Sequence, residues 1–320
     1  MARAGSSARP TLPTAIAARR RGSSRAPRWS SRSSCSRSSS KPAVPELPEV
    51  ETARRLAARV AVGRRIVEVW CAADPIVLES APSRFRAALR GRRVLAVRRH
   101  GKHLWLELDR RPWLLMHFGM TGRLHVPRRP PLRLRSTRGA PSDAWPPRFA
   151  RLHLHFDDGG ELVMADARRL GRIRLRHDPR AEPPVAGLGF DALRELPPPA
   201  RFHELLRERT APMKALLLDQ SFAAGVGNWI ADEVLYQAAI DPRRPARTLS
   251  AAESARLRAR LRAVLTLAVD AAADSDRYPR SWLFHRRWDH DPLARTARGE
   301  RIRWETIAGR TTAWAPSAQR

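Results

Sequence analysis

Short runs of β-forming residues, separated by turn signals, restrict residues 66–175 of this chain to a mostly antiparallel β domain. Gly, Pro and Asp-Gly pairs divide these runs, most clearly at residues 158–160. Ahead of them, apolar residues recur at helical spacing over residues 48–61, which predicts a leading helix. Residues 127–148 are rich in Pro and Arg and predict a long loop. The predicted strands are 66–71, 94–98, 104–108, 113–118, 152–156, 161–165 and 173–175.

The pattern changes to helical periodicity in the second half of the chain. The candidate helices are 200–209, 212–219, 228–239 and 250–271. The last 44 residues hold four Trp and turn-forming Gly residues but few long apolar runs, which favours a small β-hairpin module. We therefore predict an α+β protein of several domains. Their boundaries are 45–178 for the β domain, 179–199 for a Pro-rich linker, 200–276 for the helical domain and 277–320 for the hairpin module.

Residues 1–44 differ in composition from the rest of the chain. They contain nine Arg, one Lys and twelve Ser but no Asp or Glu, a composition typical of an organelle transit peptide. The alternative is that translation starts near Val44 and that these residues are not part of the protein. Both interpretations exclude residues 1–44 from the folded protein.

The charge of the remaining chain limits its partners. Residues 45–320 hold 51 basic and 31 acidic residues, and a folded body this basic predicts a polyanionic partner, nucleic acid first. A GC-rich genome would explain why 58 of the 61 basic residues are Arg, but not their excess over acids. No apolar stretch approaches the roughly 20 residues of a membrane-spanning helix. Two cysteines, Cys35 and Cys71, exclude a disulfide framework and a Cys-rich zinc site.

Four motifs in a fixed order resemble those of the formamidopyrimidine-DNA glycosylase/endonuclease VIII family. They are VPELPEVET at 44–52, HFGMTG at 117–122, DARRLG at 166–171 and the segment 219–236. The ending GRTTAW at 309–314 is similar to the last finger of the family. Because it lacks the four cysteines of zinc-bearing members, it resembles the zincless-finger branch known from plants, fungi and some bacteria. The resemblance implies an N-terminal β-sandwich with flanking helices, a helix-two-turn-helix domain and a zincless β-hairpin finger.

The resemblance also implies a function. The chain is expected to be a bifunctional DNA glycosylase/apurinic-apyrimidinic lyase of base-excision repair. Its expected substrates are formamidopyrimidines, oxidised purines and hydantoins in double-stranded DNA, with 8-oxoguanine a poor one because the zincless branch often removes it inefficiently. No metal or other cofactor is expected, and the protein is expected to be a monomer. Its compartment would be the bacterial cytoplasm or nucleoid, or a nucleus or organelle if residues 1–44 are a transit peptide.

The catalytic residues implied by the resemblance are Pro45, Glu46, Lys102 and Arg310. A lyase of this kind needs an amine that attacks C1′ and forms a Schiff base. An α-amino group has a pKa of about 8 against about 10.4 for Lys, so more of it is unprotonated at neutral pH. Pro45 has such an amine only if the chain begins there. Glu46 would protonate the sugar ring oxygen or assist departure of the base, Lys102 would assist elimination, and Arg310 would hold the phosphates beside the lesion.

Three residues match the side chains that fill the gap left by a flipped nucleotide. They are Met120, Arg168 and Leu170, an apolar wedge and a hydrogen-bonding arginine. The family most often has Phe at the third position, so Leu170 is expected to stack less well on the neighbouring base. Without the resemblance, Met120 is most simply interpreted as a core residue.

The glycine turn in residues 225–233 resembles the helix-two-turn-helix motif. Gly225 and Gly227 let the backbone approach a phosphate, and Asn228 starts a helix whose positive end favours an anion. The other assignments are a DNA-phosphate contact for Lys214, a DNA contact for Arg151 and an anchoring role for Glu233. The alternative function is a non-catalytic nucleic-acid-binding protein that uses the same motif and the basic surface.

Overall fold

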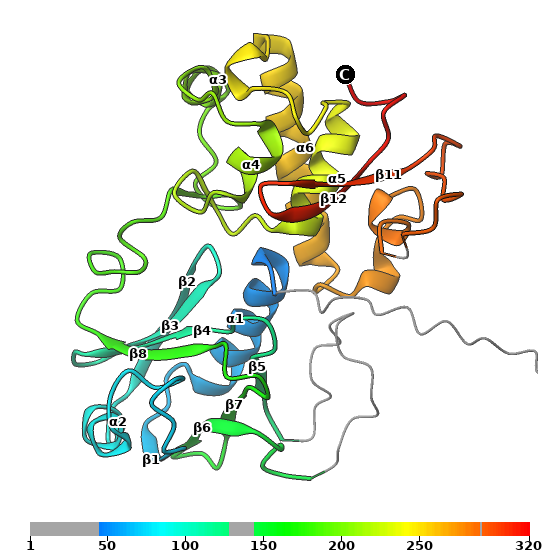
Figure 1. Ribbon diagram of the computed structural model, residues 1–320. Coiled ribbons are helices and arrows are strands. Elements are labelled where there is room, and N and C mark those ends of the chain that lie inside the picture. Colours follow the sequence, from blue (N-terminus) through cyan, green and yellow to red (C-terminus); the bar gives the residue numbers. More distant parts are fainter. Residues whose placement is uncertain (1–44, 128–143, 289) are drawn as a thin grey trace, which may run out of the picture. The chain divides into compact units, whose positions relative to one another are not determined.

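The computed structural model describes residues 45–127, 144–288 and 290–320 (Figure 1). Two four-stranded antiparallel sheets form its first part, with strand orders β1-β6-β7-β5 and β2-β3-β4-β8. Side chains from both sheets share one hydrophobic core, so the sheets pack as a sandwich. The strands are β1 Ile66–Cys71, β2 Val94–His100, β3 His103–Leu108, β4 Trp113–His117, β5 Arg123–His125, β6 Ala150–Phe156, β7 Glu161–Ala165 and β8 Arg172–Arg176.

Helix α1, Leu47–Ala61, precedes the sandwich and buries one side against the same core. The residues at its start explain where it begins. Pro48 occupies the first turn, where a missing N–H costs nothing. Glu46 and Glu49 form a capping box: the carboxylate of each residue accepts the backbone N–H of the other.

The second part of the chain is helical. It contains α3 Pro199–Arg207, α4 Met213–Leu218, α5 Asn228–Ala238 and α6 Ala251–Asp270. Nine of the eleven residues of α5 are buried, since this helix lies inside the core that α6 and its neighbours form. Ser250 and Glu253 make the capping box that starts α6. Among the residues described, no helix is both long and apolar enough to cross a bilayer.

The chain ends in an antiparallel hairpin of β11 Arg303–Ile307 and β12 Arg310–Trp314, as the sequence predicts. The hairpin packs on Tyr236 of α5 through a small apolar cluster with Leu283 and Ile302. This module holds its shape through apolar packing and a two-stranded ladder.

The structure adds elements that the sequence pattern missed. Helix α2, Pro82–Leu89, has only eight residues, too few for a clear period, although Phe85 and Leu89 are fully buried. Strand β5 has three residues. The segment predicted as a linker contains strand β9, Phe190–Asp191, which pairs in parallel with β10, Ala223–Ala224. Most of the predicted loop 127–148 lies outside the described residues, and the domain boundaries stay predictions.

Candidate active site

Glu46 joins the starts of two helices. It is the N-cap of α1, and its buried carboxylate accepts the backbone N–H groups of Trp229 at 3.0 Å and Ile230 at 3.2 Å, in the first turn of α5. Burial raises the pKa of this carboxyl, while the charge of Lys102 and the two N–H bonds act in the opposite direction. Glu46 is therefore a desolvated carboxyl that is held in one position by the positive end of α5.

The two glycines of the turn before α5 make room for this contact. A Cβ on Gly227 would lie 2.1 Å from Cδ of Glu46, which no side chain allows. Gly225 has φ +103°, and a Cβ there would lie 2.5 Å from Cδ1 of Leu47. The backbone N–H of Leu47 also donates to the carbonyl of Gly225 at 3.1 Å. The glycines thus let residues 46–47 dock directly on the turn.

Lys102 reaches the same turn from the tight connection between β2 and β3. Its ammonium donates to the carbonyl of Val226 at 2.9 Å. Burial lowers its pKa, the charges of Glu46 and Glu49 raise it, and that of Arg310 lowers it. The structure therefore brings Glu46 and Lys102, which are 56 positions apart in the sequence, onto one backbone turn. A desolvated carboxyl beside a desolvated amine is suited to move protons.

Glu49 belongs to this group although the sequence analysis did not select it as a site residue. Its Oε2 accepts the backbone N–H of Glu46 at 3.0 Å. Burial, together with the charge of Glu46, raises its pKa to about 8. Glu49 therefore holds a proton more readily than a surface carboxyl does, and it lies directly beside Glu46. The Glu-x-x-Glu spacing at the start of a predicted helix was the available sequence signal.

The raised pKa of Glu49 predicts a pH-dependent stability. The carboxyl titrates near 4.5 when unfolded and near 8 when folded, so its protonated form favours the folded protein. This contribution is complete below about pH 4.5 and is lost as the pH rises through about 8. Denaturant titrations between about pH 5 and 9 should show wild type losing stability relative to Glu49→Gln. The exposed-site variant Glu204→Gln is the control, and a constant difference for Glu49→Gln would contradict the assignment.

The finger, which is the hairpin of β11 and β12, contacts the start of α5 through Asn228. Its side-chain amide donates to the carbonyl of Thr311 on β12 at 2.9 Å. This contact joins α5 to the finger, and the phosphate contact assigned to Asn228 stays a prediction. The exposed Arg310 is the residue before Thr311, and its charge lowers the pKa of Lys102.

The phosphate contact predicted for Lys214 is wrong. Lys214 is fully buried, and its ammonium bonds the carboxylate of Asp232 and the carbonyl of Asn228, the latter at 2.8 Å. Arg287 donates to the other oxygen of Asp232 at 2.5 Å. Burial lowers the pKa of Lys214, against the raising effect of Asp232. An ammonium enclosed by these partners fixes α4 on α5 and cannot reach a phosphate.

Glu233 lies inside the helical domain, and the anchoring role assigned to it stays a prediction. Its buried carboxylate accepts the backbone N–H of Phe284 at 2.8 Å and the side-chain amide of Gln237 at 2.7 Å. Burial raises its pKa to about 7. The contact ties α5 to the chain that leads into the finger.

The candidate wedge residues lie on two turns in direct contact. Thr121 donates to a carboxylate oxygen of Asp166 at 2.5 Å, and the other oxygen of Asp166 accepts the N–H of Gly171 at 2.7 Å. Met120 on the first turn is partly exposed, while Arg168 and Leu170 on the second are exposed, Leu170 by 39%.

The DNA contact predicted for Arg151 is not supported by its position. Its guanidinium pairs with Asp74 at 3.1 Å and donates to the carbonyl of Asp166 at 3.1 Å. Arg169, with φ 57°, makes two further hydrogen bonds of 2.8 Å to Asp74. Arg151 therefore supports the turn that bears the candidate wedge residues, and its side chain is occupied within the protein.

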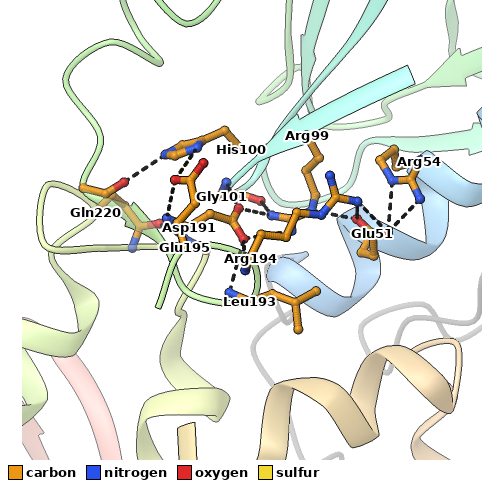
Figure 2. Close-up of polar contacts among 12 residues, drawn as sticks. Glu51, Arg54, Arg99, His100, Gly101, Asp191, Leu193, Arg194, Glu195 and Gln220 are labelled. Carbon is orange, nitrogen blue, oxygen red and sulfur yellow. Dashed lines mark hydrogen bonds and ion pairs between the residues drawn. The ribbon is translucent and has the colours of Figure 1, made fainter. Parts of the chain in front are cut away.

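A buried ion network holds the residue before Lys102 (Figure 2). The guanidinium of Arg99 donates to Glu51 of α1 at 2.9 Å and to both oxygens of Asp191 at 2.5 and 3.0 Å. Gly101 is held on both sides, since its carbonyl accepts from Arg99 at 2.8 Å and its N–H donates to Asp191 at 2.8 Å. The carboxylate of Glu51 also accepts from Arg194. The network fixes the Lys102 turn to α1 and to β9.

Comparisons with known proteins agree with this geometry. The model of the formamidopyrimidine-DNA glycosylase N-terminal domain matches residues 44–173, and that of the formamidopyrimidine-DNA glycosylase H2TH domain matches residues 188–279. The formamidopyrimidine-DNA glycosylase of Arabidopsis thaliana is 38% identical over 278 residues, 87% of this chain and 71% of that protein. The same enzyme from Thermus thermophilus is 35% identical over 86% of this chain and 98% of its own length.

Solved structures of DNA complexes have the same fold. Lactococcus lactis formamidopyrimidine-DNA glycosylase bound to DNA with an abasic site has a TM-score of 0.70 at 25% identity and covers 86% of this chain and 99% of its own. A complex of the Lactococcus enzyme with DNA that contains a formamidopyrimidine nucleotide also has a TM-score of 0.70, at 25% identity, and covers 86% of this chain and 100% of its own.

Proposed function

The chain belongs to the formamidopyrimidine-DNA glycosylase family and is a DNA glycosylase of base-excision repair that acts on damaged double-stranded DNA, and we propose that it does so through the amine of Pro45. The observation that carries the proposal is the meeting of Glu46, Lys102 and the start of α5 on the turn next to Pro45. The family model begins at residue 44, which agrees with a functional chain that starts at Pro45. Either processing or a translation start between Val44 and Pro45 would free that amine.

The proposed first step is displacement of the damaged base. The lone pair of the Pro45 nitrogen forms a bond to C1′ while the bond from C1′ to the base breaks. Glu46, whose pKa is raised by burial, gives a proton to the ring oxygen as the sugar opens. The base leaves with its bonding electron pair and takes up the proton that the Pro45 nitrogen loses, and the result is an iminium ion between Pro45 and the opened sugar.

The proposed second step cleaves the strand. Loss of a proton from C2′ of the iminium ion expels the 3′ phosphate, and a further elimination expels the 5′ phosphate. Lys102, whose pKa burial lowers, would take or deliver these protons. Arg310 would neutralise the phosphates that leave, as a permanently charged guanidinium does well. These steps use protein groups alone and need no metal.

The proposed substrates are formamidopyrimidines, oxidised purines and hydantoins. Leu170, Met120 and Arg168 would enter the gap left by the flipped nucleotide, since they lie together on two packed turns. Leu170 offers a smaller stacking surface than an aromatic ring, so we propose a preference for lesions that already weaken the stack. The protein acts in a compartment that contains DNA, and we propose the bacterial cytoplasm or nucleoid, or a nucleus or organelle if residues 1–44 are a transit peptide.

A cleavage assay on duplexes with one formamidopyrimidine or hydantoin nucleotide tests the proposal. Protein that begins at Pro45 is expected to release the base and to leave phosphates on both ends of the gap. Lys102→Ala should slow the reaction by about 100-fold or more, whereas Arg98→Ala, an exposed neighbour, should change it little. Binding of the damaged duplex without release of a base would leave only the nucleic-acid-binding function.

A further inference from the structure

A second cluster of titratable side chains lies on the β-sandwich, apart from the residues assigned to catalysis. It consists of His153 and His155 on β6 and Glu161 on β7. In the described part of the chain, this is the one group of three or more His, Cys, Asp or Glu side chains that could hold a metal ion. None of the catalytic steps proposed above uses these residues.

The strand geometry places the three side chains on one face of the sheet. His153 and His155 are two positions apart on β6, so both project to the same side. Glu161 is the register partner of His155 across the β6–β7 pair. On the other side, Glu68 of β1 is also the register partner of His155, which puts a second carboxylate on this face.

The donor atoms converge on one carboxylate oxygen. Oε2 of Glu161 lies 2.6 Å from Nε2 of His153 and 3.9 Å from Nδ1 of His155. One ligand atom from each of the three residues lies within 4.8 Å of the other two. A tetrahedral zinc ion with bonds of about 2.0–2.1 Å needs its ligand atoms roughly 3.4 Å apart. Rotation of the partly exposed His155 and Glu161 side chains can bring the three ligand atoms to that spacing.

We propose that His153, His155 and Glu161 form a binding site for a divalent transition-metal ion such as Zn²⁺. Two imidazole nitrogens and one carboxylate oxygen are a donor set that suits zinc, nickel and copper rather than magnesium or calcium. Three protein ligands leave a coordination position for water or for Glu68. The ion would fasten β6 to β7, and β6 also carries Arg151, which supports the turn that bears the candidate wedge residues.

A purely structural hydrogen-bond network is the competing explanation. Trp145 donates to the same oxygen of Glu161 at 2.6 Å, and its ring meets that of His153 edge-on. In that case the cluster would hold residue 145 on the sheet without any metal. The two explanations differ in one measurable quantity, the affinity of this cluster for a metal ion.

The test is a calorimetric titration of the full chain, stripped with a chelator and free of a histidine tag, with Zn²⁺. Co²⁺ serves as a second probe because its visible absorption reports nitrogen and oxygen ligands. The variants are His155→Ala and Glu161→Gln, with His177→Ala, an exposed histidine outside the cluster, as the matched control. Circular dichroism melts check that each variant is folded.

We expect wild type to bind Zn²⁺ with one site that His155→Ala and Glu161→Gln each weaken at least tenfold, while His177→Ala leaves it unchanged. The Co²⁺ absorption band should be lost in the same two variants. Absence of a site in wild type overturns the proposal, and so does a site of equal affinity in folded His155→Ala and Glu161→Gln protein. Strand cleavage at damaged bases is a separate measurement, so failure here leaves the proposed function untouched.

Discussion

Replacing Glu46 by glutamine is expected to slow base excision by about 10²–10⁴-fold, the range typical of a lost general acid. The carboxyl is buried and its pKa is raised, so it can hold a proton that an amide cannot give. The two carboxylate oxygens accept the N–H groups of Trp229 and Ile230, one each. Glutamine has a single side-chain oxygen, so its amide group cannot accept both in the same way. The rate of base release under single-turnover conditions measures the effect.

The control for this prediction is a glutamate outside the site. Glu204→Gln, on the exposed side of α3, should retain the wild-type rate. Thermal melts of both variants separate lost chemistry from lost structure. Folded Glu46→Gln protein that releases the base at the wild-type rate would remove Glu46 from the mechanism.

Replacing Arg99 by alanine is expected to lower the free energy of unfolding by about 3–5 kcal/mol, because it leaves the buried carboxylate of Asp191 without its cation and removes one of the cations that pair with Glu51. Arg99 is 1% exposed, and Glu51 and Asp191 on either side of it are also buried (Figure 2). The same change removes the hydrogen bond to the carbonyl of Gly101 and loosens the Lys102 turn, so the rate of base release should fall as well. Denaturant titration measures the stability.

The adjacent Arg98 is the matched control for Arg99. Its guanidinium is 56% exposed and pairs with Glu107 at the surface, so Arg98→Ala should cost less than about 1 kcal/mol. Adding Asp191→Asn to Arg99→Ala should restore part of the loss, because the charge left unpaired at residue 191 is removed. A loss for Arg99→Ala no larger than that for Arg98→Ala would contradict the network's role.

The regular elements could be predicted from the sequence because their signals are local. Alternation and turn residues placed β1 and β7 at the bounds that the structure shows, and helical spacing did the same for α5 and α6 within about one residue. Helix α2 was missed because its eight residues are too few to show a period, and strand β9 was missed because it forms by pairing with a distant segment. Strand β9 exists only through its pairing with β10, 33 positions later.

The candidate site could be predicted only where a motif is specific to the family. Lys102 was assigned from the resemblance, and in the structure it contacts the same turn as Glu46. The resemblance also gave Lys214 a phosphate contact, but a motif match says nothing about burial or about an internal partner such as Asp232. Arg99 is one of 58 arginines, so the sequence does not distinguish it, and only its contacts in the structure show its role in the buried ion network.

The most direct test of the account is trapping of the covalent intermediate with borohydride on DNA that contains an abasic site. Reduction of the iminium ion would fix the protein to the DNA, and peptide mass spectrometry would identify the linked residue. We expect an adduct on Pro45 from protein that begins at that residue, and none from the chain with residues 1–44 attached. An adduct from that longer chain, or an undiminished one from Pro45→Gly combined with Lys102→Ala, would contradict it.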